Sequence, residues 1–177
     1  AGTYRLNGRD TAQLNDDELS HLRAEQLGFV FQSYHLVARL SAVDNVALPL
    51  LFAGVPRAER RRRALAVLDA VGLSDRVDHR PSELSGGRRQ RVAVARAMVM
   101  GPRVLLADEP TGNLDSTAGA QVLELLDRLH AEGLTLVVVT HNATVARRAD
   151  RVLILVDGKI ARRVAGSELT GSDLLST

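Results

Sequence analysis

Residues 104–116 read VLLADEPTGNLDS, and this stretch decides the fold. Its first four residues are apolar, and two adjacent carboxylates, Asp108 and Glu109, follow them directly. A short apolar run that ends in turn-forming residues is typical of a strand buried in a parallel sheet. Acidic side chains at the carboxyl end of such a strand predict a site that holds a metal ion or activates water.

The composition is that of one globular domain without disulfide bonds. The chain has 177 residues, of which 45% are hydrophobic and 25% are charged, as in ordinary soluble proteins. Because it has no cysteine, disulfides and thiolate metal sites are excluded. No apolar run approaches the ~20 residues that span a bilayer. The first ten residues lack the basic and apolar regions of a signal peptide.

Arginine supplies nearly all of the positive charge. The formal net charge is +2, and Lys159 is the only lysine. The basic run RAERRRR at 57–63 does not predict nucleic-acid binding, because consecutive arginines wrap around a helix and form no single stripe. We interpret this run as the solvated start of a surface helix, and we expect no nucleic-acid partner.

Strand and helix patterns alternate along the chain. Strands are expected at 3–8, 27–32, 103–107 and 134–140, helices at 14–26, 88–100 and 118–133, a short helix near 143–150, and a hairpin at 151–164 that turns at Asp157-Gly158. Strands that alternate with helices and read as continuous apolar runs predict an α/β fold with a mostly parallel sheet.

The sequence divides into core and inserted parts. Residues 41–82 read as helical, with breaks at Pro49, at AGVP (53–56) and at VGLSD (71–75), and this stretch interrupts the α/β alternation. We therefore expect a single domain made of three parts. The α/β core covers 1–40 and 85–165, the inserted helical subdomain covers 41–84, and the polar tail covers 166–177.

Three further polar sites are each weak signals alone. In LSGGRRQ (84–90), Ser85 can cap the following helix while Gly86 and Gly87 leave its first amides bare, which makes an anion site. Gln32 and His141 each end an apolar strand pattern. Individually, a Ser-Gly-Gly turn, a solvated acid pair, a satisfied histidine and a surface glutamine would each be ordinary structure.

Their order along one chain gives these signals weight. Ligands of open parallel sheets bind at the carboxyl ends of the strands. We therefore predict that Gln32, Ser85, Asp108 and His141 line one edge of the sheet, and a chance occurrence of the whole set is very small.

On these residues the chain resembles the nucleotide-binding subunit of ATP-binding cassette (ABC) transporters. Gln32 is similar to the Q-loop glutamine, LSGGRRQRVAVARA (84–97) to the signature, VLLADEP (104–110) to the Walker B strand, NLDS (113–116) to the D-loop and His141 to the switch histidine. The segments GFVFQSYHLVARLSAVDNVALPL and LLADEPTGNLDS look most like bacterial ATPases of the lipoprotein-release, macrolide-export and cell-division type.

The resemblance implies ATP and Mg²⁺ as cofactors and a catalytic role for several residues. Asp108 would hold the magnesium ion, and Gln32 would touch the metal or the attacking water. Glu109 would orient or deprotonate that water, and His141 would contact the γ-phosphate.

The resemblance also implies a dimer, in which each site is built from both chains. Ser85, Gly86 and Gly87 would bind the γ-phosphate of a nucleotide held by the opposite subunit, and Asp115 would lie at the dimer contact. The further implied partner is an integral-membrane transporter subunit, which places the protein in the cytoplasm at the inner face of the membrane.

The sequence departs from the family pattern at three points. Arg88 stands where the signature usually has glutamine, and Asn142 stands where relatives often have an acid. The third departure is that no G-x-x-x-x-G-K-[ST] phosphate-binding loop occurs, because Lys159 lies in a hairpin turn and isoleucine follows it.

In relatives that loop, with its strand and helix, precedes the segment similar to GTYRLNG; on the order of 50 residues are involved. We therefore expect an amino-terminally truncated cassette that is inactive alone. Since the loop strand would lie between 134–140 and 151–156, we also expect a gapped or closed-up sheet.

Two alternatives remain open. The first is an ABC-type ATPase of DNA repair or translation, which is disfavoured because the interval between Gln32 and Ser85 is short and contains no cysteine. The second is a natural non-catalytic partner that offers only its signature face to a complete subunit.

Overall fold

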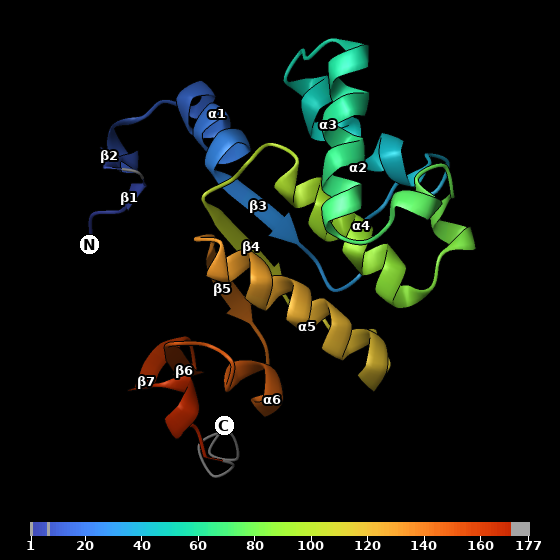
Figure 1. Cartoon of the computed structure of the whole chain (residues 1–177). Coiled ribbons are helices and arrows are strands. Elements are labelled where there is room, and N and C mark those ends of the chain that lie inside the picture. The colour runs from blue at the N-terminus through green and yellow to red at the C-terminus, as the bar shows by residue number, and fades with distance from the viewer. Residues whose placement is uncertain (1, 7, 171–177) are drawn as a thin grey trace.

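A three-stranded parallel sheet forms the centre of the molecule (Figure 1). The computed structural model describes residues 2–6 and 8–170. Strands β3 (Leu27–Val30), β4 (Val104–Asp108) and β5 (Thr135–Val139) lie in that order. The pairing of Val30 with Ala107 and of Asp108 with Val139 aligns their carboxyl ends. The expected α/β fold with a parallel sheet is confirmed.

The amino-terminal segment differs in part from the single strand expected at 3–8, because two short paired strands form there instead. Strands β1 (Arg5–Leu6) and β2 (Arg9–Asp10) form an antiparallel pair, and a 3₁₀ turn leads to helix α1 (Asp16–Gln26). Asn15 begins α1 with a capping box, in which its side chain accepts from the Glu18 amide and the Glu18 carboxylate accepts from the Asn15 amide.

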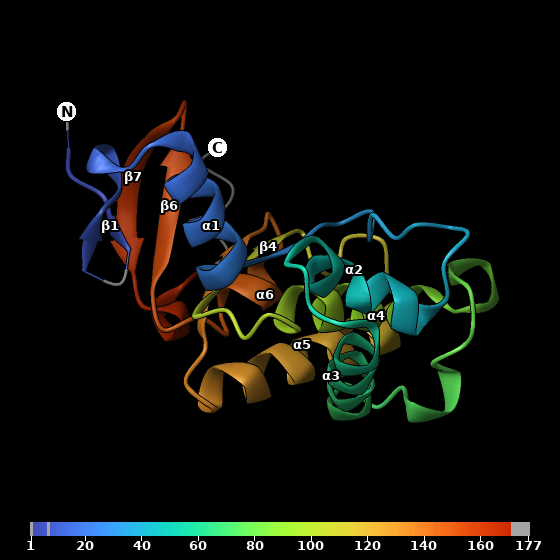
Figure 2. The same cartoon turned by 90° about the horizontal axis from the view of Figure 1, so that it is seen from above.

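The inserted segment folds into helices α2 (Ala42–Phe52) and α3 (Arg57–Ala70), which lie at the end of the molecule opposite the β6–β7 hairpin (Figure 2). The expected break at Pro49 is wrong, because α2 runs through it. Proline removes one amide donor from the helix, but the buried face of Val46 and Leu50 keeps the turn packed. The breaks at Gly54 and Gly72 are confirmed, both with positive φ.

The basic helix start has the solvated character that was expected. Arg62 and Arg63 donate to the Glu59 carboxylate and hold the pKa of that carboxyl at about 2. Arg60 donates instead to the backbone carbonyl of Val55, and Arg61 pairs with Asp78. These arginines have local partners within the helical subdomain.

Both core crossovers place their helices on one face of the sheet. Since βαβ connections are right-handed and the strands follow in chain order, α4 (Gly86–Met98) and α5 (Ser116–Ala131) lie on the same side. Helix α4 begins two residues earlier than the expected 88. The strand residues on the covered face, such as Leu105, are buried. Gly28 permits the close approach of α4 to β3, since a Cβ there would lie 2.8 Å from the Ala97 carbonyl oxygen.

The opposite face of the sheet is open, so the strands that the apolar runs predicted as buried are buried on one face only. Phe29 is 42% exposed, Val137 48% and Val139 62%. Strand β5 has no partner on its outer edge among the described residues, because β6 (Val152–Val156) pairs only with β7 (Lys159–Val164). The expected gap between these two parts of the sheet is present.

The carboxyl-terminal elements differ from expectation in one respect. The short helix α6 (Ala143–Ala146) and the hairpin turn at Asp157-Gly158, both residues with positive φ, are confirmed. The start of the expected polar tail is instead packed: Leu169 is buried, and its carbonyl accepts from Arg147. Residues 171–177 of that tail lie outside the described residues.

A buried asparagine in α2 fixes the loop that precedes this helix. The Asn45 side chain is fully buried, accepts from the Val37 amide at 2.7 Å, and donates to the carbonyls of Val37, Leu40 and Ser41. We expect Asn45→Ala to lower the free energy of unfolding by roughly 3 kcal/mol, because buried backbone groups lose their partner. Urea unfolding would measure this loss. The control Asp44→Ala removes only an exposed bond to Ser41 and should cost less than about 1 kcal/mol; equal losses would contradict the prediction.

Candidate functional site

The two adjacent acids at the end of β4 have different surroundings. The Asp108 carboxylate is exposed and has no hydrogen-bond or ion-pair partner among the residues that the structure describes. Glu109 has a φ of 44°, a left-handed backbone conformation that is uncommon outside glycine. Its amide donates to the Val139 carbonyl at 2.9 Å, which extends the β4–β5 ladder by one residue. The turn therefore directs the two side chains to different environments.

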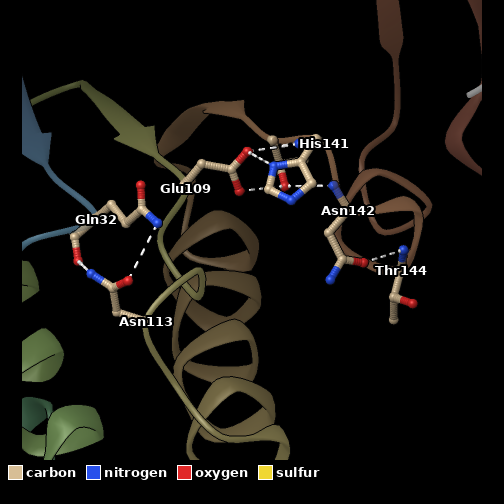
Figure 3. Close-up of polar contacts among 7 residues, drawn as sticks. Gln32, Glu109, Asn113, His141, Asn142 and Thr144 are labelled. Atoms are coloured by element: carbon tan, nitrogen blue, oxygen red, sulfur yellow. Dashed lines mark hydrogen bonds and ion pairs between the residues drawn. The ribbon is translucent and has the colours of Figure 1, made fainter. Parts of the chain in front are cut away.

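The Glu109 carboxylate is held by the end of β5 (Figure 3). Its Oε1 accepts from the His141 amide at 2.7 Å and lies 2.6 Å from the His141 Nδ1, and its Oε2 accepts from the Thr140 hydroxyl at 3.0 Å. An ionised carboxylate only accepts, so Nδ1 carries the proton in this pair. The Glu109 side chain is 17% exposed and that of His141 87%. A nearly buried carboxylate thus meets an imidazole that faces solvent.

Gln32 lies across the turn that follows β4. Its Nε2 donates to the Asn113 Oδ1 at 3.4 Å, and the Asn113 Nδ2 donates to the Gln32 carbonyl at 3.1 Å (Figure 3). Gly112 makes this approach possible, because a Cβ there would lie 2.6 Å from the Gln32 Nε2. The loop after β3 and the turn after β4 are therefore joined by a reciprocal amide pair.

The same loop is anchored to helix α4. Tyr34 and His35 both have positive φ, and the Arg96 guanidinium donates to their carbonyls at 3.0 and 2.6 Å. Burial lowers the pKa of Arg96. The Tyr34 hydroxyl donates to the Asn113 carbonyl, and the Arg89 guanidinium lies 5.2 Å from the Tyr34 ring centroid. Two unusual backbone conformations are thus fixed by one half-buried cation.

The amino terminus of α4 meets the turn after β4. Ser85 caps the helix by accepting from the Arg88 amide at 3.4 Å, as expected. Gly86 and Gly87 also have a packing role, because a Cβ on Gly87 would lie 2.9 Å from the Ala118 Cβ. The buried Gln90 side chain donates to the Pro110 carbonyl at 2.8 Å. These contacts fix the helix start against the acidic turn.

Two polar residues of the site are helix caps. The Asp115 side chain accepts from the Ala118 amide at 2.8 Å and begins α5. Asn142, one of the departures from the family pattern, accepts from the Thr144 amide at 2.8 Å and begins α6. Asparagine caps a helix as well as aspartate does, so this departure preserves the local structure.

The expected gathering at one edge of the sheet is confirmed. Asp108 and His141 follow the same ends of paired parallel strands, and Gln32 follows the third. A Cβ on Gly86 would lie 3.2 Å from the Tyr34 hydroxyl, which places the α4 start at this edge as well. Lys159 instead begins β7 in the separate hairpin. The chemical roles of the gathered residues stay predictions.

Sequence reasoning missed four residues that build the site: Tyr34, Arg96, Asn113 and Thr140. Only Arg96 had a usable signal, because Arg89 and Arg96 are seven residues apart and lie on one face of α4. Tyr34 and Thr140 act through their hydroxyls and Asn113 acts through its side-chain amide, and none of these contacts leaves a periodic pattern in the sequence.

The donor set fits a magnesium ion that is bound together with a nucleotide. No group of three or more His, Cys, Asp or Glu side chains that could hold a metal occurs among residues 2–6 and 8–170. Magnesium commonly takes one or two carboxylates and completes its shell with phosphate and water oxygens. The unpartnered Asp108 carboxylate and the amide oxygen of Gln32 would supply such a partial shell.

The chain is similar to known transport ATPases in sequence. The model of the ABC transporter family matches residues 1–112. The macrolide export ATP-binding/permease protein MacB of Brucella melitensis is 54% identical over 90% of this chain, and the pyoverdine export ATP-binding/permease protein PvdT of Pseudomonas entomophila is 50% identical over 95%. The chain spans about a quarter of the length of these relatives, 25% and 26% respectively.

The fold is similar to solved cassettes. The dimeric post-hydrolysis structure of the ATP-binding cassette MJ0796 bound to ADP and Pi matches with a TM-score of 0.80 and 42% identity, over 93% of this chain and 73% of that one. Within the part of the chain that the structure describes, every helix is too short or too polar to cross a membrane.

Proposed function

Because this chain belongs to the ABC transporter family, we propose that it forms part of the ATP-hydrolysing subunit of a bacterial export system. The observation that carries this proposal is the Glu109 carboxylate, which is held nearly buried at the end of β4 by His141 and Thr140. A water-activating base needs a fixed position within reach of the reacting atoms. Hydrolysis of ATP by the complete subunit with Glu109→Gln is the direct test.

The four strand-end residues take separate roles in this proposal. Asp108, which has no partner among the described side chains, would hold magnesium. Glu109 would accept a proton from the attacking water, and His141, bonded through Nδ1, would have Nε2 available for the γ-phosphate. Gln32 would touch the metal or water and report its state to the loop that Arg96 anchors. ATP with Mg²⁺ supplies the phosphoryl group and its charge neutralisation.

A second subunit completes the site in this proposal. Ser85 and Asp115 are exposed. Gly86 and Gly87 leave the start of α4 without side chains, which a helix needs if its amides are to bind the phosphate of a nucleotide held by another chain. The MJ0796 cassette, which is similar in fold, is dimeric with bound ADP and Pi. We expect a homodimer in which the signature residues of each chain face the nucleotide of the other.

The relatives support the macrolide-export type among the three subgroups expected from the sequence, because their names describe macrolide and pyoverdine export. The Glu109–His141 pair favours a hydrolysing subunit over a non-catalytic partner, which needs only the signature face.

We propose further that the helical subdomain docks an integral-membrane partner at the inner face of the membrane. Phe52 at the end of α2 is 84% exposed, its neighbour Leu51 is 47% exposed, and Val37 in the loop before α2 is 41% exposed. The relatives combine ATP-binding and permease parts in one protein, as their names state. An exposed aromatic beside aliphatic residues is typical of a docking anchor.

The complete ATPase segment, expressed as a separate polypeptide, is expected to sediment with membranes only when the membrane part is co-expressed. Phe52→Asp should lower the membrane-bound fraction about tenfold, because a charge replaces the apolar anchor. The control Ile160→Asp changes a residue of the β6–β7 hairpin that is 48% exposed, and it should leave recovery unchanged. Full recovery of the unaltered segment in the soluble fraction, with the membrane part present, would contradict the proposed docking.

A further inference from the structure

A single hydroxyl connects the Glu109 carboxylate to the loop that begins α6. Thr140 follows the last residue of β5 and is half-buried. Its Oγ1 donates to the Glu109 Oε2 at 3.0 Å and accepts from the Asn142 amide at 3.0 Å. The hydroxyl therefore has one partner on each side.

The direction of the Thr140 proton follows from the chemistry of these partners. A threonine hydroxyl has one proton and two lone pairs. The Asn142 N–H can only donate, so it occupies a lone pair of the hydroxyl oxygen. An ionised carboxylate can only accept, so the single proton points to the Glu109 Oε2. The amide of the α6 turn thus orients the hydroxyl toward the carboxylate.

The carboxylate of Glu109 is held at both oxygens. His141 binds Oε1 through its amide and its ring, and Thr140 binds Oε2. Bonds to Oε1 alone would allow the carboxylate plane to rotate, because the terminal torsion of glutamate has broad minima. The bond from Thr140 removes this freedom, while the left-handed backbone of Glu109 directs the side chain toward β5.

We propose that Thr140 is a positioning residue for ATP hydrolysis, which fixes the plane of the Glu109 carboxylate through its hydroxyl. This inference rests on the proposed role of Glu109 as the catalytic carboxylate. Thr140 acts through its hydrogen bond to Glu109 and not through a contact with the nucleotide. A displacement of about 1 Å at a reacting group can lower a rate by about 100-fold, so loss of the hydroxyl should affect the chemical step rather than nucleotide binding.

The test compares shape-conserving variants in the complete ATPase subunit. Thr140→Val keeps the branched shape and removes the hydroxyl, and it is expected to lower kcat about 10- to 100-fold with KM for ATP changed less than about twofold. Thr140→Ser restores the hydroxyl and should restore kcat to within about threefold of the unaltered enzyme. The matched control Thr144→Val removes the hydroxyl of an exposed threonine whose described bond to Asn142 uses only its amide, and it should have no effect.

A purely structural role for Thr140 in the loop would give a different pattern. In that case Thr140→Val would raise KM for ATP as well as lower kcat. Thr140→Ser would then not restore kcat selectively. Combining Thr140→Val with Glu109→Gln adds a second readout, because the two changes should be non-additive when the hydroxyl acts only through Glu109. If the valine variant fails to fold, as judged by thermal unfolding, Thr140→Ala should show the same loss of kcat at constant KM.

The outcomes separate this inference from the proposed function. A normal kcat for Thr140→Val, with Glu109→Gln inactive, would overturn the inference alone. Normal turnover of Glu109→Gln would overturn the proposed function and this inference with it. Additive losses in the double variant would also contradict a role that passes through Glu109.

Discussion

Glu109→Gln in the complete subunit is expected to lower ATP turnover at least about 100-fold while ATP binding stays close to normal. The amide has the shape of the carboxylate and keeps an oxygen that can accept from the His141 amide. It cannot take a proton from water, and positioned bases commonly contribute 10²- to 10⁴-fold to a rate. Asp108 and Gln32 are unchanged, so the affinity for the nucleotide should remain close to normal. Steady-state ATP hydrolysis and equilibrium ATP binding measure the two effects separately.

The same variant should accumulate a dimer in the presence of ATP, because uncleaved nucleotide bridges the signature of one chain to the site of the other. Size-exclusion chromatography with and without magnesium-ATP would show the shift in elution volume. Glu124→Gln makes the same chemical change on an exposed face of α5, and it should leave both turnover and oligomeric state unchanged. Near-normal turnover of Glu109→Gln would exclude Glu109 as the catalytic carboxylate.

The sequence determines the core topology well because each signal is local. The apolar run before Asp108 predicts β4, and the Asp157-Gly158 pair predicts the hairpin turn, with both residues in the left-handed region as such turns require. The exposure of Val137 and Val139 could not be predicted in this way. Whether an apolar strand face is covered depends on the side to which the crossovers pass and on the next strand in the sheet, and neither is encoded within the strand itself.

Pro49 shows the second limit of local reasoning. Its propensity predicts a break, but the buried faces of Val46 and Leu50 on either side favour a continuous helix, and the packing outweighs one lost backbone bond. The fold therefore follows local signals where they agree with burial and departs from them where they do not.

The candidate site was predictable at the level of residues and unpredictable at the level of their contacts. Strand-end positions identify Gln32, Asp108 and His141 as neighbours, since parallel strands bring their carboxyl ends together. The sequence does not show that Asn113 would form two hydrogen bonds with Gln32, or that the Thr140 hydroxyl would donate to the Glu109 carboxylate. Those contacts depend on the turn geometry after β4 and on the register of β5, both of which arise only in the folded chain.

The polypeptide of 177 residues is expected, on its own, to bind magnesium-ATP with a dissociation constant above roughly 1 mM and to show no measurable hydrolysis. Phosphoryl transfer depends on positioning and on charge stabilisation. A phosphate-binding loop supplies its amides, a lysine and a magnesium ligand to the β- and γ-phosphates. The sequence contains no such motif, and Lys159 begins β7 in a sheet separate from Asp108. Isothermal titration of the purified polypeptide with magnesium-ATP measures the affinity.

The open face of the central sheet predicts that the 177-residue polypeptide associates with itself. Val137 and Val139 present apolar surface beside the outer edge of β5, which has no strand partner in the described part of the chain. Such an edge favours association between copies, so we expect poor solubility, which light scattering during purification would detect. A longer polypeptide that includes a G-x-x-x-x-G-K-[ST] loop serves as the control, and it should bind ATP and stay dispersed. Micromolar binding by the 177-residue polypeptide would contradict the prediction and would mean that other residues hold the phosphates.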